Sequence, residues 1–399
     1  MLTLADECNY RIDTQDGVLG EGSFGKVFKG HSRSSGEPVA IKVLPMRRPS
    51  SLVSKKNKSE ALLHSPVRQK GFLPAQASSG RNWRSSHDGS PSSPDLSNTV
   101  GIRVEELKVI QAIDSEFVIR IHQTYAYDGC FFIVMELCDS CLDEIFAEIR
   151  DRSPSTASGS QQLLCDHNLM KLAESLICGY QLLYRNNIMH RDIKPQNILI
   201  RLAKEGQTDD GQRHIAAAKL SDFGTSRLKG NGVPHALVGS PLYMAPEVGA
   251  NLLQESDYDA KVDMWSVGVV LYESATGQVP FEEQKLCRLF LNASAGNFKV
   301  YPTPTLAEGL PLLLRVVVPR LLQIDSRERI GPEQLADCYA RLAGRGAAST
   351  PAAGDDNGLR GALERLLQHV DSRKVLFEAA WTICDLLIHG SLSHTVDWH

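Results

Sequence analysis

The stretch that most constrains this chain is a polar loop between two short apolar runs, residues 188–200, with the sequence IMHRDIKPQNILI. The apolar residues at its two ends are typical of buried strands, and packing alone does not explain so polar a loop between them. Asp192 can accept a proton or orient a hydroxyl, Asn197 can bind a metal ion, and Lys194 can neutralise a phosphoryl group. We therefore expect this loop to carry chemistry.

A second feature is the glycine-rich stretch LGEGSFGKVFKG, in which Gly20, Gly22 and Gly25 form G-x-G-x-x-G. In a dinucleotide-binding turn the third glycine opens a helix. Here polar and apolar residues alternate after it, which predicts a hairpin whose backbone amides can lie over phosphates. A hairpin without a ligand is the alternative. Lys42, in the apolar run VAIKV, favours the phosphate interpretation because a lysine in a buried strand is costly unless it is paired.

Composition excludes several classes of protein. The chain has 399 residues, 42% hydrophobic and 23% charged, which is ordinary for one large two-lobed domain or two smaller domains. A net charge of −4 gives no signal for nucleic acid. Nine scattered cysteines indicate a reducing, intracellular setting, and the lone C-x-x-C of Cys138 and Cys141 has no second pair to complete a zinc site. We expect neither a signal peptide nor a membrane span.

The polar loop resembles the catalytic loop of eukaryotic protein kinases, H-R-D-x-K-x-x-N, and Lys194 is typical of its serine/threonine form. Other motifs of that family follow in the family's order: the glycine loop, Val-Ala-Ile-Lys ending at Lys42, Asp-Phe-Gly beginning at Asp222, Ala-Pro-Glu ending at Glu247, and Asp263. The resemblance covers residues 10–342. It implies an α+β, bilobal protein-kinase-like fold with a small β-rich N-lobe and a larger helical C-lobe.

The resemblance also implies phosphoryl transfer from Mg²⁺-bound ATP to protein serine or threonine hydroxyls. Asp192, Lys194 and Asn197 would be the catalytic residues, and Asn197 with Asp222 would hold Mg²⁺. Lys42 would pair with a glutamate on the next helix, and Glu106 is favoured over Glu105, whose side chain should face solvent. This helix should lead into a strand at residues 117–121. The ATP-binding positions implied are Leu19, Gly20, Gly22, Gly25, Val27, Ala40, Lys42, Glu106, Met135, Glu136, Cys138 and Leu199.

Several structural contacts follow from the same resemblance. Ser240 should lie near Lys194, Glu247 should pair with Arg329, and Asp263 should brace the catalytic loop from behind. Glu273 is a carboxylate that could recognise an arginine preceding the target residue.

Segments outside the family pattern are an N-terminal extension at 1–9, a basic, serine-rich insertion at about 46–98, and polar insertions at about 151–162 and 201–214. The first insertion cannot bury enough apolar surface to fold alone, so we expect disorder, and its Ser-Pro pairs are candidate phosphorylation sites. Residues 343–357 read as a linker. The tail, 358–399, has helical spacing and would either dock on the large lobe or bind a regulatory partner.

The activation segment departs from the family. Arg191 is typical of kinases in which a phosphate orders this segment. Residues 227–239 contain no Ser, Thr or Tyr, and Ala236 stands at the usual phosphorylated position. Either the segment orders without phosphate, or Thr225, Ser226, Ser240 or a partner substitutes. We predict appreciable activity from unphosphorylated protein.

Within the family, GSPLYMAPEV and KPQNIL are most similar to the autophagy-initiating kinases, with the NIMA-related kinases second. This implies protein substrates and a cytoplasmic or nuclear location. The competing hypothesis is a pseudokinase scaffold, which usually lacks the residues equivalent to Lys42, Asp192 or Asp222. A small-molecule kinase is disfavoured because such enzymes lack the G-S-P…A-P-E platform.

Overall fold

The structure is a computed structural model that describes residues 9–13, 17–22, 25–46, 104–152, 162–207, 212–228, 240–250 and 259–343. The chain divides into two compact units, Met1–Leu342 and Ala343–His399. The predictions for the 46–98 insertion beyond Met46, for the linker beyond residue 343 and for the tail lie outside the described residues.

The N-terminal part of the first unit is an antiparallel sheet, which we call the N-lobe together with helix α2 (Val104–Gln111). Its strand order is β1-β3-β4-β6-β5, with β2 pairing on β3. The predicted hairpin at the glycine-rich stretch is confirmed, because β2 and β3 pair antiparallel. The strands are β1 (Tyr10–Ile12), β2 (Val18–Gly22), β3 (Gly25–Ser32), β4 (Pro38–Pro45), β5 (Ile121–Tyr127) and β6 (Cys130–Glu136).

Close approach of the strands explains one of the glycines. A Cβ atom at Gly25 would lie 2.1 Å from the carbonyl oxygen of Val43, so only glycine fits at the start of β3. A Cβ atom at Gly20 would meet none of the described atoms within 4 Å, so packing against the described chain does not require glycine there. Packing of the described chain therefore requires glycine at Gly25 but not at Gly20.

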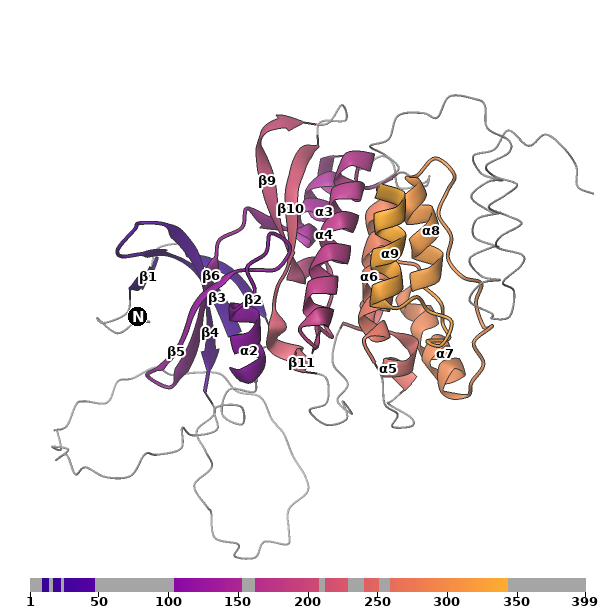
Figure 1. The fold of residues 1–399 in the computed structure, drawn as a ribbon, viewed down its shortest axis with the longest axis horizontal. Coiled ribbons are helices and arrows are strands. Elements are labelled where there is room, and N and C mark those ends of the chain that lie inside the picture. The colour runs from indigo at the N-terminus through magenta and orange to yellow at the C-terminus, as the bar shows by residue number, and fades with distance from the viewer. Residues whose placement is uncertain are drawn as a thin grey trace, which may run out of the picture. The chain divides into compact units, whose positions relative to one another are not determined.

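Helices form the C-terminal part of the unit, which we call the C-lobe. In Figure 1 they stand beside one another on the side away from the N-lobe sheet. Helix α6 is buried almost along its whole length because its sequence, KVDMWSVGVVLYESAT, is apolar on every face. The helices are α3 (Leu142–Arg152), α4 (Asp166–Arg185), α5 (Pro246–Ala250), α6 (Lys261–Thr276), α7 (Glu283–Ser294), α8 (Leu312–Leu321) and α9 (Pro332–Ala343). The predicted α+β bilobal fold is confirmed.

Short strands between the two lobes position the polar loop. The loop runs from β8 (Ile188–Met189), through the 3-10 turn η2 (Pro195–Asn197), to β9 (Ile198–Gln207). β9 pairs with β10 (Arg213–Leu220) and with β7 (Ser140–Cys141), while β8 pairs with β11 (Arg227–Leu228). Much of the polar insertion predicted at 201–214 thus belongs to the paired strands β9 and β10.

One element begins later than expected. Residues 117–121 read as a strand, but β5 starts at Ile121. The preceding backbone pairs with β10 instead: Ile119 N donates to Leu220 O, and Leu220 N donates to Phe117 O, both at 2.9 Å. These bonds join the N-lobe to the C-lobe next to the polar loop.

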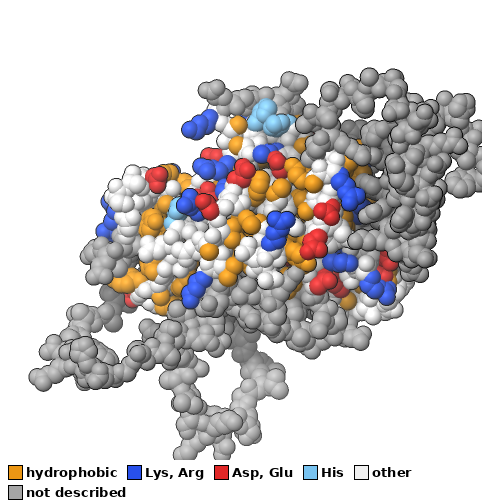
Figure 2. All heavy atoms as spheres, viewed as in Figure 1, with side chains coloured by type: hydrophobic (Ala, Val, Ile, Leu, Met, Phe, Trp, Pro, Cys, Tyr) orange, Lys and Arg blue, Asp and Glu red, His pale blue; other side chains and the backbone are white. Residues whose placement is uncertain are grey.

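Charged side chains of both signs are interspersed on the face shown in Figure 2. Among the described residues, no helix combines the length and the apolar character that crossing a bilayer requires.

Candidate active site

The polar loop is fixed by one fully buried carboxylate. Asp263, on α6, accepts hydrogen bonds from the backbone N–H groups of His190 (2.8 Å) and Arg191 (2.7 Å). The Tyr180 hydroxyl donates to the same carboxylate at 2.7 Å. Burial, and then the charge of Asp263, raise the pKa of Tyr180 well above its usual value, so this hydroxyl remains a donor. The brace predicted for Asp263 is confirmed.

Asp192 lies at the centre of the loop. One oxygen, Oδ2, accepts from Asn197 Nδ2 at 2.9 Å and lies 2.9 Å from Lys194 Nζ. The other, Oδ1, is buried and has no hydrogen-bond partner among the described residues. Asp192 also lines a small pocket, together with residues that include Ser240, Tyr243 and Met244. An acceptor oxygen left unpaired beside a pocket can receive the hydroxyl of a substrate.

The predicted contact of Ser240 with Lys194 is also confirmed. Lys194 Nζ donates to Ser240 Oγ at 3.0 Å, while it pairs with Asp192. The ammonium group is therefore held between the catalytic loop and the residue that precedes the 3-10 turn η4 (Pro241–Tyr243).

Asp222 follows β10 and approaches the same region from the other side. Its Oδ1 accepts from Lys42 Nζ, on β4, at 2.6 Å and from Gly224 N at 3.3 Å. Burial alone would raise the pKa of Asp222, but the neighbouring Lys42 ammonium outweighs it, so the pKa lies below its ordinary value. Glu106 lies in α2, but its side chain is outside the described residues, so the Lys42–Glu106 pair stays a prediction.

The residues suggested for Mg²⁺ suit that ion. Ser221 N and Ser221 Oγ each donate to Asn197 O at 2.9 Å, which joins the backbone beside Asp222 to Asn197. Asn197 donates through Nδ2 to Asp192, and no donor among the described residues contacts its amide oxygen. Mg²⁺ typically takes one or two protein oxygens and completes its shell with phosphates and water. No cluster of three or more His, Cys, Asp or Glu side chains suited to a metal occurs among the described residues.

The segment predicted to bind adenine is the end of β6. Met135 pairs with Ala40 across the sheet, and Glu136 pairs with Val39. Cys138, just beyond, is half-buried, and burial followed by the charge of Glu136 raises the pKa of its thiol to about 12. This thiol is therefore protonated at neutral pH.

The other predicted ATP-binding positions surround this segment. Val27, on β3, lies opposite Lys42, and Leu199, on β9, pairs with Cys141. Leu19, on β2, is 46% exposed. The roles assigned to these positions stay predictions.

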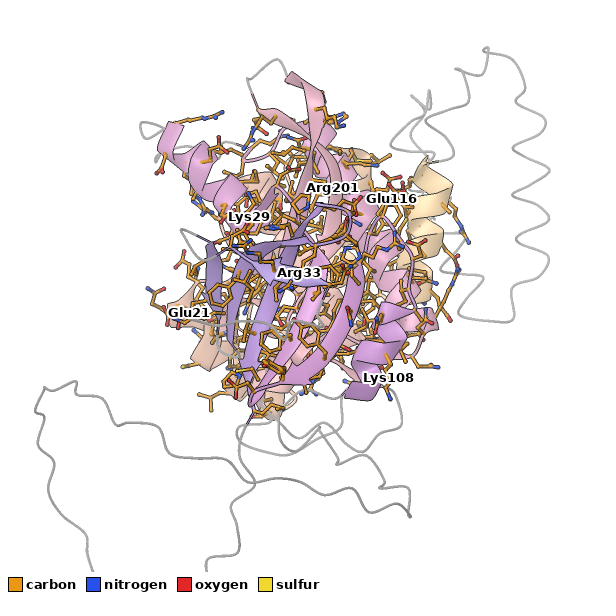
Figure 3. The ribbon with its side chains drawn as sticks, turned by 90° about the vertical axis from the view of Figure 1, so that its left-hand side faces the viewer. Glu21, Lys29, Arg33, Lys108, Glu116 and Arg201 are labelled. Carbon is orange, nitrogen blue, oxygen red and sulfur yellow. The ribbon has the colours of Figure 1, made fainter. Side chains whose placement is uncertain are left out.

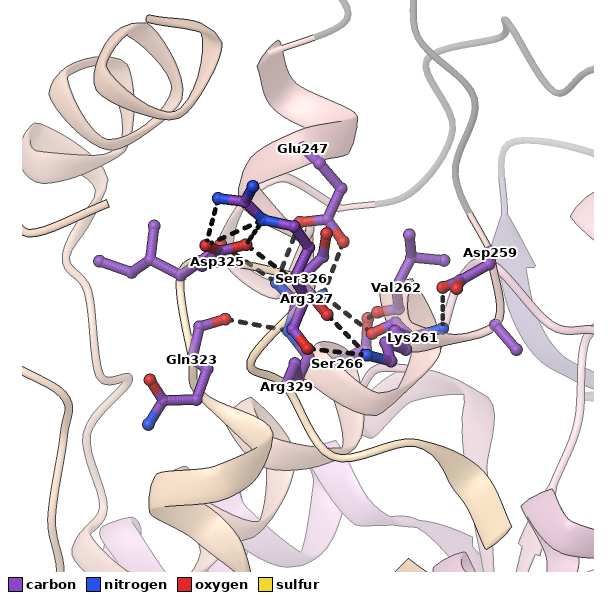
Figure 4. A network of polar contacts seen from close by, with 12 residues as sticks. Glu247, Asp259, Lys261, Val262, Ser266, Gln323, Asp325, Ser326, Arg327 and Arg329 are labelled. Atoms are coloured by element: carbon purple, nitrogen blue, oxygen red, sulfur yellow. Dashed lines mark hydrogen bonds and ion pairs between the residues drawn. The ribbon is translucent and has the colours of Figure 1, made fainter. Parts of the chain in front are cut away.

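The predicted pair of Glu247 and Arg329 is confirmed. Arg329 is 1% exposed and donates to both oxygens of Glu247, at 2.6 and 2.9 Å (Figure 4). Its guanidinium also donates to the carbonyl of Lys261 and lies over the ring of Trp265. This contact fixes α5 against α6.

Two charged residues have partners that were not expected from the sequence. Glu273, considered as a site for a substrate arginine, is buried, and its carboxylate already accepts from Arg150 (3.1 Å) and from the Tyr243 hydroxyl (2.7 Å). Lys219, on β10, is 5% exposed and lies 2.9 Å from Glu136. The argument applied to Lys42, that a lysine in an apolar strand needs a partner, would have identified Lys219.

The residues considered as substitutes for the usual phosphorylated residue of the activation segment differ in burial and contacts. Ser226 is buried, and Ser240 is bound to Lys194. The side chain of Thr225 and residues 229–239, including Ala236, lie outside the described residues.

Comparisons with known proteins match protein kinases. Residues 94–338 match the protein kinase domain; the match begins after β4, so Lys42 lies outside it. A serine/threonine-protein kinase ATG1 of Colletotrichum lindemuthianum is 29% identical over 319 residues, which cover 72% of this chain and 39% of that protein. The serine/threonine-protein kinase ATG1b of Arabidopsis thaliana is 34% identical over 190 residues, 47% of this chain and 23% of that protein. CBL-interacting protein kinase 30 of Oryza sativa subsp. japonica is 28% identical over 324 residues, 80% and 52% of the two chains. The matched regions thus span between about a quarter and a half of these relatives.

Proposed function

Because the chain belongs to the protein kinase family, we propose that it transfers the γ-phosphoryl group of ATP to serine or threonine hydroxyls of protein substrates. The ATG1 kinases among its relatives agree with the resemblance of its motifs to the autophagy-initiating kinases. We therefore propose autophagy-type signalling as its setting.

One observation carries the proposal. Side chains from three separate segments converge between the lobes: Lys42 from β4 contacts Asp222 after β10, and Asp192 lies on the loop whose Asn197 is bonded to Ser221. A structural role alone would not leave the Asp192 Oδ1 atom buried and unpaired.

Each residue then has a distinct role in the transfer. Asp192 Oδ1 would accept the hydrogen of the substrate hydroxyl and orient its oxygen toward the γ-phosphorus. Lys194, held by Asp192 and Ser240, would stabilise negative charge on the transferring group. Lys42 would bind the α- and β-phosphates. Asn197 and Asp222 would hold Mg²⁺, which supplies neutralisation of the phosphate charge.

The main alternative is a nucleotide-binding scaffold without activity. To separate the two, ATP consumption and transfer of labelled phosphate to a generic protein acceptor are measured for the purified chain and for Asp192→Asn. We expect transfer by the wild type, and in Asp192→Asn a loss of about 10²–10⁴-fold in kcat with ATP binding retained. A wild-type chain that binds Mg²⁺-ATP but transfers no phosphate would support the scaffold instead.

A further inference from the structure

A buried lysine and a largely buried glutamate, one from each lobe, meet where the lobes join. Glu136 is the last residue of β6 and follows Met135, while Lys219 lies on β10, three residues before Asp222. Lys219 Nζ and Glu136 Oε1 lie 2.9 Å apart, and their side chains are 6% and 15% exposed. Lys219 Nζ also donates to the carbonyl of Ser115 at 3.2 Å.

The same carboxylate organises the backbone around it. Arg120 N donates to Glu136 Oε1 at 2.8 Å, and Glu136 N donates back to Arg120 O at 3.0 Å. Just before Arg120, the backbone is bonded to β10 at Leu220. The end of β6, the connection from α2 to β5, and β10 are thus joined around one ion pair.

Lys219 is the cation that this carboxylate depends on. A charge removed from water needs a close, well-placed partner, and Lys219 is both closer and more buried than any other described cation near Glu136. Arg201, on β9 (Figure 3), lies 3.6 Å from Glu136 Oε2. Its side chain is 54% exposed, so water screens its contribution.

We propose that Lys219 is a positioning residue for the nucleotide, a role that rests on the proposed function. Its ion pair fixes the backbone at Glu136 and Cys138, where adenine would bind, against β10. Because β10 leads directly into Asp222, one strand sets the distance between the adenine end and the phosphate end of the site. Loss of the pair releases the adenine end while leaving Asp192 and its contacts in place.

The test compares Lys219→Met with Arg201→Met in the full chain. The two substitutions remove a cation from the same carboxylate, one buried and one exposed. We expect Lys219→Met to raise the KM for ATP about tenfold, equivalent to about 1.4 kcal/mol, with kcat changed by less than about twofold. Arg201→Met should change neither by more than about twofold. An unchanged KM for ATP in Lys219→Met, or an equal rise in Arg201→Met, would overturn the proposal.

A double variant separates positioning from simple neutralisation. In Lys219→Met/Glu136→Gln no buried charge is left unpaired, so we expect thermal stability to recover while the KM for ATP stays raised. Recovery of both would show that Lys219 only neutralises Glu136. Titration calorimetry with Mg²⁺-ATP gives the same comparison as dissociation constants. It therefore decides the role of Lys219 even if the wild type proves to transfer no phosphate, which would refute only the proposed function.

Discussion

Replacing Arg329 with methionine tests how much one buried ion pair stabilises the C-lobe. The substitution keeps an unbranched apolar stem and removes the guanidinium. Glu247 then loses two hydrogen bonds of 2.6 and 2.9 Å, and the carbonyls of Lys261 and Gln323 lose donors at 2.9 and 3.0 Å. These groups lie between α5, α6 and α8, so the variant leaves polar atoms unpaired where the helices pack.

The expected cost follows from these contacts. Removing one partner of a buried ion pair typically destabilises a protein by about 3–5 kcal/mol. The Glu247 side chain is 20% exposed, so water can solvate part of the carboxylate, and we expect the lower end, about 3 kcal/mol. In domains of 150–250 residues each kcal/mol shifts Tm by about 2–4 °C, so the fall should be about 6 °C or more.

Arg327 provides a matched control only two residues away. It makes a similar fork to Asp325 (Figure 4), at 2.7 and 2.9 Å, but its side chain is 76% exposed. Solvent screens that pair, so Arg327→Met should unfold close to the wild-type temperature. Thermal unfolding followed by fluorescence measures both variants. The reasoning is refuted if Arg329→Met unfolds within about 1 °C of the wild-type temperature, or if the two variants show the same fall in Tm.

Three further outcomes are expected. Phosphatase-treated chain should keep appreciable kinase activity, because residues 227–239 offer no hydroxyl to phosphorylate, and complete loss of activity would contradict this. Iodoacetamide at about pH 8 should label the exposed Cys287 well before Cys138, because a pKa of about 12 leaves only about 10⁻⁴ of Cys138 as thiolate. Labelling of Cys138 should accelerate as the pH rises, and equal labelling rates of the two cysteines by peptide mass spectrometry would be inconsistent with the burial of Cys138. Gly249→Ala should lower the urea midpoint of unfolding, because the added Cβ would lie 2.4 Å from the Phe290 ring and overpacking costs about 1–3 kcal/mol. Gly309→Ala is the control: its Cβ would meet none of the described atoms within 4 Å, so the urea midpoint should not change.

The sequence predicted best where a charged residue stands among apolar ones. Asp263 in VDMW stands among apolar residues and needs a partner, whereas Arg329 in RERI was identified by its position in the family; the resemblance supplied partners for both, and the structure confirms them. Lys219 satisfies the same rule within AAAKL, yet its partner Glu136 could not be identified from the sequence. No local periodicity relates β10 to the end of β6, because their contact arises from packing between the lobes.

Contacts between segments set several features that the local sequence could not predict. The residues around 201–214, expected as a polar insertion, include parts of β9 and β10, whose backbones pair antiparallel. Residues 117–120 read as a strand and instead bond to β10. Glu273 looked available to a substrate, but Arg150 at the end of α3 reaches it, a contact set by how α3 packs rather than by spacing along the chain.

Backbone strain in the site links the stability of the core to the chemistry. Arg191 and Asp222 both have positive φ angles, 71° and 59°, which cost non-glycine residues about 1–3 kcal/mol each. For Arg191 the compensating contact is the 2.7 Å hydrogen bond from its N–H to Asp263. Since Asp263 lies on α6, a helix buried along most of its length, the position of Asp192 depends on a residue outside the catalytic loop. A change that loosens α6 should therefore reduce kcat before it unfolds the chain, because the strained loop relaxes as soon as its brace moves.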